Sequence, residues 1–317
     1  MIKRIIVILF LLIAFPVWAD QLIIEPDMGR KPILDAINSA QHSIDLVMYG
    51  FTDKDLLNAI LKKKSNGKTI HVILERNPYK AENENKQTID AFNTNQIAWL
   101  GHITPFRLIH QKTLILDESK AMVMTFNFTH STFKNERNFA LIIDDPQRVQ
   151  AIASIFSADW NHVPSFNHAH DVIVSPDNSR NMFISLITHA QTSIQIYAQN
   201  LNDYKIVGVL AKAAKSGVTI QILTSKPLRE KQSHYLTRAG IAIHYSQKFM
   251  IHAKVLIIDN QQAVIGSNNL THASLDDNRE LSVITHDPNV IKQLTATFSH
   301  DWNNKTRMDY PHHVPHY

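Results

Sequence analysis

The sequence contains no cysteine and only 8 glycines among its 317 residues. The lack of cysteine excludes disulfide bonds, a catalytic thiolate and zinc sites built on cysteine. Motifs for metal or nucleotide binding are missing too, since there is no H-E-x-x-H pair, no acidic calcium loop and no Walker-type glycine loop. We therefore expect neither a metal nor another cofactor, and we expect the chemistry to rest on histidine, lysine, amide and carboxylate side chains.

Long apolar runs are also missing, except at the start of the chain. There Lys3 and Arg4 precede an uninterrupted apolar run at residues 5–15, and small residues suit a cleavage site just before Asp20. The pattern predicts a signal peptide at residues 1–19. The alternative is an uncleaved anchor, although the run is short compared with the ~20 residues of a membrane span. In either case we expect export, to the periplasm or out of the cell.

Charge of one sign is not in large excess. The formal net charge is +4, and it falls to +2 without residues 1–19, because 30 basic and 28 acidic residues then remain. This near balance is weak evidence for a polyanionic partner such as nucleic acid. With 44% apolar and 19% charged residues, the composition is typical of a globular chain that buries a large core.

What the sequence does contain is the motif H-x-K-x4-D in two copies. Each copy is followed by an asparagine and a threonine, and the distance from His to Thr is 19 residues in both. The first copy comprises His110, Lys112, Asp117, Asn127 and Thr129, and the second comprises His252, Lys254, Asp259, Asn269 and Thr271. Because chance would give about 0.08 copies in a chain of this composition, the repeat is not accidental.

The spacing within each copy suits chemistry at phosphorus. If the motif lies on a strand, the histidine and the lysine two residues later point to the same face. Imidazole can attack phosphorus or move protons near neutral pH, lysine binds phosphate oxygens, and the amides of Asn127 and Asn269 can donate to the same oxygens. A displacement through a covalent intermediate needs both a nucleophile and an acid for the leaving group. Since each half of the chain supplies one histidine, we expect the two halves to face each other.

The repeat extends beyond the motif to most of the chain. Segments 43–49 and 67–74 match segments 193–199 and 217–224 at an offset of 150, whereas the motif copies are offset by 142. The first half therefore carries eight extra residues, which we place in the polar stretch 77–95 because it has loop and exposed-helix character.

Each half is predicted to alternate strands and helices and then to add three adjacent strands and a closing helix. In the first half we expect helices at residues 31–40, 53–64 and 146–160, and strands at residues 44–49, 69–74, 110–116, 121–126 and 138–143, with a similar series from 179 to 302. This order predicts an α/β fold of two similar α/β sandwich halves with mixed sheets, related by a pseudo-two-fold axis, with the active site between them. The predicted divisions are signal peptide 1–19, first half 20–163, second half 164–305 and tail 306–317.

Two further features are assigned to structure. An Asp-Trp-Asn triplet recurs at residues 159–161 and 301–303, and a tryptophan that closes a helix is expected in the core. The tail holds His312, His313 and His316, for which a frayed end is favoured over a loose metal site.

The duplicated motif resembles that of the phospholipase D superfamily of phosphodiesterases, the H-K-D enzymes, and the resemblance covers nearly the whole chain after residue 19. It implies a covalent phosphohistidine intermediate and catalysis without a metal. It also implies that His110 is the nucleophile and His252 the general acid, because the N-terminal motif usually attacks in this family. The implied catalytic set is His110, His252, Lys112, Lys254, Asn127, Asn269 and Glu280. Because both motifs lie in one chain, we expect a monomer.

The family pattern places N-x-E after the second asparagine, and residues 278–280 match it. A carboxylate such as Glu280 can accept from the Nδ1–H of a histidine, fix its tautomer and stabilise its cation. The aligned residue in the first half is Asn138, and Glu136 stands two residues earlier, on the same strand face if the strand extends so far.

Four residues are predicted to support the site: Asp117, Asp259, Glu136 and Ser267. The two aspartates end apolar strands, where aspartate often caps a turn. The hydroxyl of Ser267, like that of Thr125, either lines the site or caps local backbone. The first half also has Met124 where the second has Gly266, and a decayed first site is the alternative that these departures leave open.

The leading functional hypothesis is an exported phospholipase D that hydrolyses headgroup phosphodiester bonds of phospholipids, in peripheral contact with a membrane. A metal-independent endonuclease that acts on DNA or RNA through the same site is the alternative. A cardiolipin synthase-like phosphatidyl transferase is a further alternative, and it would usually bring membrane-spanning helices. A non-enzymatic binding protein is disfavoured because both motif copies are intact. Residues that flank the motifs, namely Phe106, Leu108, Phe249 and Met250, either admit an acyl-glycerol or pack the core.

Overall fold

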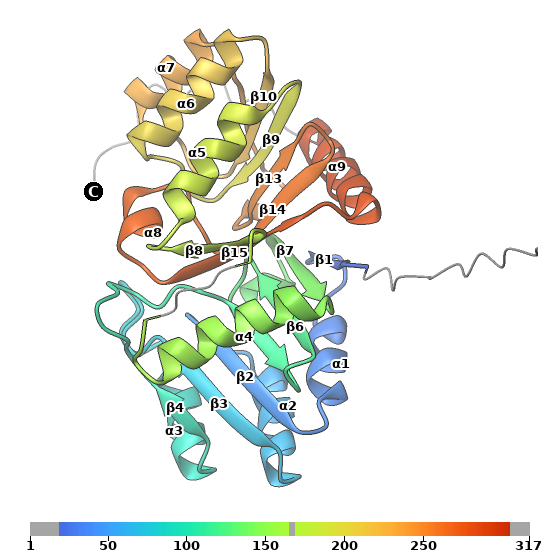
Figure 1. Ribbon diagram of the computed structural model, residues 1–317, viewed down its shortest axis with the longest axis vertical. Helices are drawn as coiled ribbons and strands as arrows, with labels where there is room; N and C mark the ends of the chain where they lie inside the picture. Colours follow the sequence, from blue (N-terminus) through green and yellow to red (C-terminus); the bar gives the residue numbers. More distant parts are fainter. Residues whose placement is uncertain (1–18, 165–168, 305–317) are drawn as a thin grey trace, which may run out of the picture.

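Two halves of the same topology make up the computed structural model, which describes residues 19–164 and 169–304 (Figure 1). The first half contains β1 (Gln21–Glu25), α1 (Lys31–Ser39), β2 (Ser43–Met48), α2 (Lys54–Ser65), β3 (Thr69–Leu74), α3 (Lys86–Thr94), β4 (Ala98–Leu100), β5 (Thr113–Leu116), β6 (Lys120–Met124), the 3-10 helix η1 (Ser131–Phe133), β7 (Glu136–Ile143) and α4 (Pro146–Trp160). The second half contains β8 (Val172–Ser175), α5 (Ser179–His189), β9 (Ser193–Ala198), α6 (Tyr204–Lys215), β10 (Thr219–Thr224), α7 (Glu230–Arg238), β11 (Ala242–Tyr245), β12 (Met250–Ile251), β13 (Lys254–Ile258), β14 (Gln262–Gly266), α8 (His272–Asp276), β15 (Glu280–Thr285) and α9 (Pro288–Asn303). The predicted signal peptide, up to residue 18, and the histidines of the tail lie outside the described residues.

The two sheets have matching strand orders. The first runs β4-β3-β2-β5-β6-β7-β1 and the second β11-β10-β9-β13-β14-β15-β8. In each sheet the first three strands are parallel, and the other neighbouring pairs are antiparallel. The α/β fold with two similar halves and mixed sheets, predicted from the order of elements, is thereby confirmed.

Repeated local sequences start and stop the equivalent helices. An Asp-Pro pair opens both α4 and α9, and the carboxylates of Asp145 and Asp287 accept backbone N–H bonds in the first turn. Gly67 and Gly217 follow α2 and α6 with φ angles of +78° and +100°, a left-handed conformation that favours glycine. Equivalent helices therefore begin and end at equivalent places, so the strands that follow them enter each sheet in the same register.

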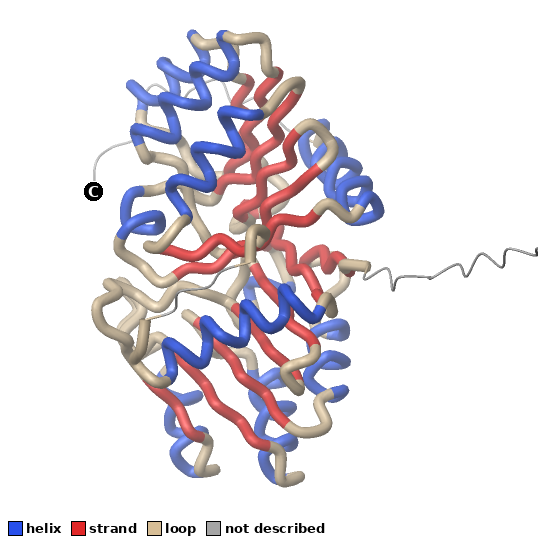
Figure 2. The backbone as a smooth tube through the Cα atoms, viewed as in Figure 1, coloured by secondary structure: helices blue, strands red, loops and turns tan. Residues whose placement is uncertain are grey.

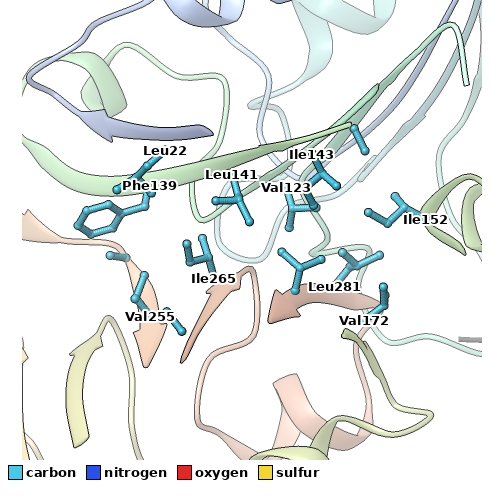
Figure 3. Close-up of a cluster of buried hydrophobic side chains, with 14 of the residues drawn as sticks. Leu22, Val123, Phe139, Leu141, Ile143, Ile152, Val172, Val255, Ile265 and Leu281 are labelled. Carbon is cyan, nitrogen blue, oxygen red and sulfur yellow. The ribbon is translucent and has the colours of Figure 1, made fainter. Parts of the chain in front are cut away.

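The inner faces of the two sheets share one hydrophobic core. Val123 and Leu141 of the first sheet lie in the same cluster as Ile265 and Leu281 of the second (Figure 3). Helices α4 and α9 also pack against this cluster, whereas α1–α3 and α5–α7 cover the outer faces of their own sheets (Figure 2). This shared burial fixes the relation of the two halves, so that each can contribute side chains to one site.

Two buried arginines also join the halves at symmetric positions. Arg137 donates through Nε and Nη2 to Asp301, at 2.7 and 3.1 Å. Arg279 donates in the same manner to Asp159, at 2.8 and 2.7 Å. The aspartates of the two Asp-Trp-Asn triplets, which the sequence assigned to structure, are thus ion-paired across the interface between the halves.

Several predicted boundaries are wrong by a few residues, and one difference matters for the site. The strand predicted at 110–116 starts only at Thr113, because the chain before it leaves its own sheet and pairs with the opposite half. The extra residues of the first half lie mainly between β3 and α3, where 11 residues stand against 5 between β10 and α7. Within the described residues, no helix combines the length and the apolar character needed to cross a membrane.

Candidate active site

Each motif histidine is placed by backbone bonds to the other half of the molecule. His110 N donates to the carbonyl of Arg279 at 2.9 Å, and His252 N donates to the carbonyl of Arg137 at 3.2 Å. Next to these bonds, β12 pairs in parallel with the start of β7, and Ile109 forms the equivalent bridge to Arg279. The crossing of the two segments therefore brings both histidines to the interface between the halves.

His110 is held by a carboxylate from the second half. Its Nδ1 lies 2.8 Å from Oε2 of Glu280, which is fully buried. The other carboxylate oxygen, Oε1, accepts from the hydroxyl of Ser274 at 2.6 Å. Burial pushes the pKa of Glu280 upward, but His110, Lys112 and Ser274 outweigh it and the pKa is lowered. An ionised Glu280 accepts only, so Nδ1 of His110 carries the hydrogen and Nε2 is left for the substrate.

His252 is held by an amide from the first half instead. Its Nδ1 lies 3.0 Å from Oδ1 of Asn138, and Nδ2 of Asn138 donates to Glu136 Oε2 at 3.1 Å. The hydroxyl of Thr125 also donates to Oδ1 of Asn138, at 2.9 Å. The bond from Nδ2 to Glu136 orients the Asn138 amide so that its oxygen faces His252 and can accept from an Nδ1–H of that ring. Glu136 itself remains 3.9 Å from that nitrogen, so it acts through Asn138.

The two motif lysines are buried close to their histidines. Nζ of Lys112 donates to the carbonyl of His110 at 2.6 Å, and Nζ of Lys254 donates to the carbonyl of His252 at 2.5 Å. Nζ of Lys254 also donates to the carbonyl of Thr125 at 2.9 Å. Although the histidines do not lie on regular strands, the predicted pairing of imidazole and ammonium is present in both half-sites.

Burial sets the protonation of the four basic groups. It lowers the pKa of His110 to about 4 and the pKa of Lys112 to about 7. It also lowers the pKa of His252 and of Lys254 well below their ordinary values, and the neighbouring ammonium groups act in the same direction on both. Both imidazoles are therefore neutral near pH 7 in the empty site. A phosphodiester anion would restore positive charge on the lysines, because an opposite charge within a few ångströms raises their pKa.

The motif asparagines, Asn127 and Asn269, follow their lysines at the same spacing but differ in their contacts. Oδ1 of Asn127 accepts from Gly50 N at 3.3 Å. Asn269 is almost fully buried, and its Oδ1 has no hydrogen-bond partner among the described residues. A buried acceptor without a donor is costly, and a hydroxyl of the substrate could donate to this oxygen, whereas a phosphate oxygen can accept only from Nδ2 of the same amide.

Tyr49 is a site residue that motif analysis missed. Its ring lies edge-on to the imidazole of His110, with centroids 4.7 Å apart, and Nζ of Lys112 stands 5.3 Å from the ring centre. Its hydroxyl accepts from the backbone N–H of Tyr79 at 2.7 Å. The sequence held an indication of this role, since Tyr49 ends the segment 43–49, and its counterpart in the matching segment 193–199 is Gln199.

Two further missed residues, Glu75 and Ser225, position the residue before each histidine. Oε2 of Glu75 accepts from Ile109 N at 2.8 Å, and Oγ of Ser225 accepts from Ile251 N at 2.5 Å. Both follow the central parallel strand of their half, at the offset of 150. Asn138 is the fourth missed residue, because the sequence assigned the support of His252 to Glu136 alone.

The remaining predicted residues lie where they support backbone. Asp117 accepts from three successive N–H groups at residues 41–43, and Asp259 accepts from those at 191–193. Ser267 bonds the backbone of Leu281 and does not reach the histidines. The two aspartates are thus turn caps, and Ser267 holds the start of β15 next to Glu280.

The arrangement brings two imidazoles, each held through Nδ1, and two buried amines to the interface between the halves, with the amides of Asn127 and Asn269 as further donors from the same motifs. Such a set can attack phosphorus from one side and deliver a proton on the other. Among residues 19–164 and 169–304, no three histidine, aspartate or glutamate side chains are grouped so as to hold a metal ion.

Comparison with known proteins places this site in a family. The family described as "Cardiolipin synthase, PLD-like domain" matches residues 33–160 and 183–302, which cover most of the chain. Among curated relatives, the major cardiolipin synthase of Bacillus subtilis is 23% identical over 317 residues, covering 85% of this chain and 66% of the relative. A cardiolipin synthase of Geobacillus sp. is 24% identical over 255 residues, covering 69% and 51%. The chain thus spans about half to two thirds of the length of these relatives.

Solved structures share the fold at low sequence identity. Polyphosphate kinase from Porphyromonas gingivalis superposes with a TM-score of 0.73 at 16% identity, over 90% of this chain and 47% of the kinase. Phosphatidylserine synthase from Haemophilus influenzae superposes with a TM-score of 0.67 at 12% identity, over 90% of this chain and 86% of the synthase. Both likenesses concern the two-halved fold and leave the substrate open.

Proposed function

The chain belongs to the phospholipase D superfamily, and on that premise we propose that it transfers the phosphatidyl group of a phospholipid to an alcohol through a phosphohistidine. The pair of imidazoles, each fixed at Nδ1 by the opposite half, carries the proposal, because it leaves two Nε2 atoms for one phosphorus. The phospholipid substrate is favoured by the names of the curated relatives, which are cardiolipin synthases. They favour transfer over the hydrolysis that the sequence alone placed first.

The proposed first step is displacement at phosphorus. The bound phosphodiester anion raises the pKa of His252, so His252 enters the step protonated on both ring nitrogens. Nε2 of His110 forms a bond to phosphorus while the bond from phosphorus to the headgroup oxygen breaks, and His252 gives its Nε2 proton to that oxygen. The carboxylate of Glu280 stabilises the positive charge that develops on His110. Lys112, Lys254 and the two motif amides bind the non-bridging oxygens.

The second step reverses the first with a new alcohol. His252, now neutral, takes the proton of the acceptor hydroxyl while that oxygen attacks phosphorus and releases His110. If the acceptor is the glycerol headgroup of another phosphatidylglycerol, the product is cardiolipin. If it is water, the product is phosphatidic acid, so transfer and hydrolysis share one intermediate and differ in the acceptor.

A substrate panel tests this proposal on the purified chain from Asp20 onward. Phosphatidylglycerol is expected to give cardiolipin and glycerol, with phosphatidic acid as the minor product. The controls are phosphatidylcholine, phosphatidylethanolamine, single-stranded DNA and duplex DNA. Phosphatidic acid as the only lipid product would establish the hydrolase instead. Faster cleavage of DNA than of any lipid, at equal phosphodiester concentration, would contradict the phospholipid assignment.

We also propose that residues 1–19 direct export and are removed before Asp20. The basic start and the apolar run at residues 5–15 support this. Intact-mass measurement of the protein from the native cell envelope tests it. A mass that begins at Asp20 is expected, and a mass that retains the first residue would contradict cleavage.

A further inference from the structure

Two apolar side chains related by the internal repeat stand shortly before the motif histidines. Leu108 and Met250 each stand two positions before a motif histidine, and in an extended segment such residues share a face with that histidine. The residues between them, Ile109 and Ile251, are buried. Leu108 is partly exposed, and Met250 is 40% exposed. A large apolar side chain that reaches solvent thus precedes each motif histidine by two positions.

The neighbouring aromatic residues have a different task. The ring of Phe106 lies 4.7 Å from the guanidinium of Arg279, and that of Phe249 lies 4.3 Å from the guanidinium of Arg137. These phenylalanines cover the two arginines that join the halves. Of the four flanking residues that the sequence left open between substrate and core, Met250 is in the exposed class, and Leu108 is partly exposed and covers neither arginine in this way.

Tyr79 is a third exposed apolar side chain that is linked to the site. Its side chain is 65% exposed, and its backbone N–H is bonded to the hydroxyl of Tyr49, whose ring contacts His110. It lies on the loop between β3 and α3, which is six residues longer than the equivalent loop of the second half. The longer loop thus carries an exposed aromatic ring on a residue whose backbone is bonded to Tyr49.

Basic side chains alternate with these apolar ones. Nζ of Lys80 lies 5.4 Å from the ring centre of Tyr79, and Nζ of Lys248 lies 4.7 Å from that of Phe249. Lys226 is exposed and directly follows Ser225, whose hydroxyl binds Ile251 N. The charge of Lys226 contributes to lowering the pKa of both His252 and Lys254, which fits a position facing the site.

We propose that a set of residues around the site, here named the mouth rim, docks the protein on an anionic phospholipid bilayer. The mouth rim consists of Leu108, Met250, Tyr79, Lys80, Lys226 and Lys248. Apolar side chains next to lysines are what peripheral proteins bury at the boundary between headgroups and acyl chains, while the lysines gain from the negative surface. The inference rests on the proposed phospholipid substrate, and it explains how a buried site reaches a phosphodiester at a membrane surface. A nucleic acid would use the lysines but would not need Leu108 and Met250.

Vesicle binding tests the docking separately from turnover. The His110→Ala protein is sedimented with phosphatidylcholine vesicles, with or without phosphatidylglycerol, so that no lipid is consumed. Binding is expected to require phosphatidylglycerol, to weaken at high salt, and to fall at least ~10-fold when Leu108→Ser and Met250→Ser are combined. Matched controls are Met28→Ser and Tyr235→Ser, with side chains 46% and 47% exposed. Met28 lies by Gln21 and Lys120 at the far end of the first sheet, and Tyr235 packs near Lys215 at the end of α6.

A second measurement compares turnover of vesicles with turnover of short-chain, monomeric phospholipid. In the active protein, the ratio of vesicle rate to monomer rate is expected to fall at least ~10-fold in the Leu108→Ser, Met250→Ser variant and in Tyr79→Ser. An equal loss on both substrates, or unchanged vesicle binding, would overturn the docking surface. Lipid turnover without vesicle binding would refute the docking and keep the proposed function. Vesicle binding without turnover of any phospholipid would keep the docking and refute the function.

Discussion

The half-sites around His110 and His252 share one backbone frame and differ in the group that holds Nδ1. In both, the segment before the histidine pairs with the start of a strand from the opposite half. The difference lies in the order of two residues, since the first half reads Glu-Arg-Asn at 136–138 and the second Asn-Arg-Glu at 278–280. The carboxylate and the amide have exchanged places around a common arginine.

This exchange teaches how one duplicated frame can support two roles. A carboxylate on Nδ1 stabilises the cation that forms when Nε2 bonds to phosphorus, which favours His110 as the nucleophile. An amide stabilises an imidazolium less, so a proton on His252 leaves more readily, which suits the acid for the leaving group. The first half keeps a carboxylate near the equivalent place in the frame. Its Glu136 acts one hydrogen bond further away, through Asn138.

Removal of either imidazole should produce the largest effect, and the leaving group should separate the two roles. His110→Ala and His252→Ala are each expected to lower turnover of a phospholipid by at least ~10²-fold. With a p-nitrophenyl phosphodiester, whose leaving group needs no proton, His252→Ala should recover a large part of its activity and His110→Ala should not. Steady-state rates on the two substrates check this. Equal recovery of both variants would contradict the assignment of different roles to the two histidines.

Exchanging the carboxylate and the amide of the first half, so that they stand in the order of the second half, should shift the pH profile of turnover. In the double variant Glu136→Asn, Asn138→Glu, a carboxylate contacts His252 directly, and its charge should raise the pKa of that histidine. The alkaline limb of the turnover profile, which reports the proton donor, is expected to move up by about 1 pH unit. The single variant Glu136→Gln, which keeps the amide at 138, is the matched control. An unmoved limb in the double variant would show that Nδ1 does not set the acidity of His252.

The symmetric part of the frame should respond equally in both halves. Arg137→Met and Arg279→Met each remove the arginine that neutralises a buried aspartate, which should lower the free energy of unfolding by about 3–5 kcal/mol. Urea unfolding followed by circular dichroism checks this. A loss in one variant only would mean that the two ion pairs across the interface are not equivalent.

A smaller difference between the halves lies at Glu25, whose counterpart at the offset of 150 is Ser175. Glu25 is fully buried, its Oε1 has no partner among the described residues, and burial raises its pKa from 4.5 to about 8. Because the folded state keeps the proton that the unfolded state has lost, stability should fall as pH rises from 4.5 to 8.

Glu25→Gln removes that dependence. The variant should therefore gain stability over the original chain by about 1 kcal/mol per pH unit in this window, close to the linkage limit for one group. Urea titrations at about pH 5, 6, 7 and 8, which span the window of the shift, measure the difference in the free energy of unfolding between the variant and the original chain. A constant difference at all pH values would show that Glu25 is ionised in the fold.

The sequence predicted the fold and the paired histidines because both rest on local periodicity and on a repeat. Buried strands such as Thr113–Leu116 and helix caps such as Asp145 are visible in neighbouring residues. The family pattern named Glu280, but which histidine it holds was not visible, nor was the role of Asn138, because these two residues come from the opposite half, 170 and 114 residues away from their histidines. Likewise, Tyr49 and Glu75 contact the site only after the parallel strands have brought their ends to it. Contacts between the halves depend on the packing of two sheets, which no short segment specifies.

Mapping the covalent intermediate tests the assignment of roles most directly. The protein is mixed with a slowly released, radiolabelled phosphodiester, quenched in alkali, digested, and the labelled peptide is sequenced by mass spectrometry. The account predicts phosphate on the peptide that contains His110, because only this imidazole has a carboxylate on Nδ1 to stabilise its cation. Phosphate on the peptide that contains His252 would contradict it and reverse the two roles.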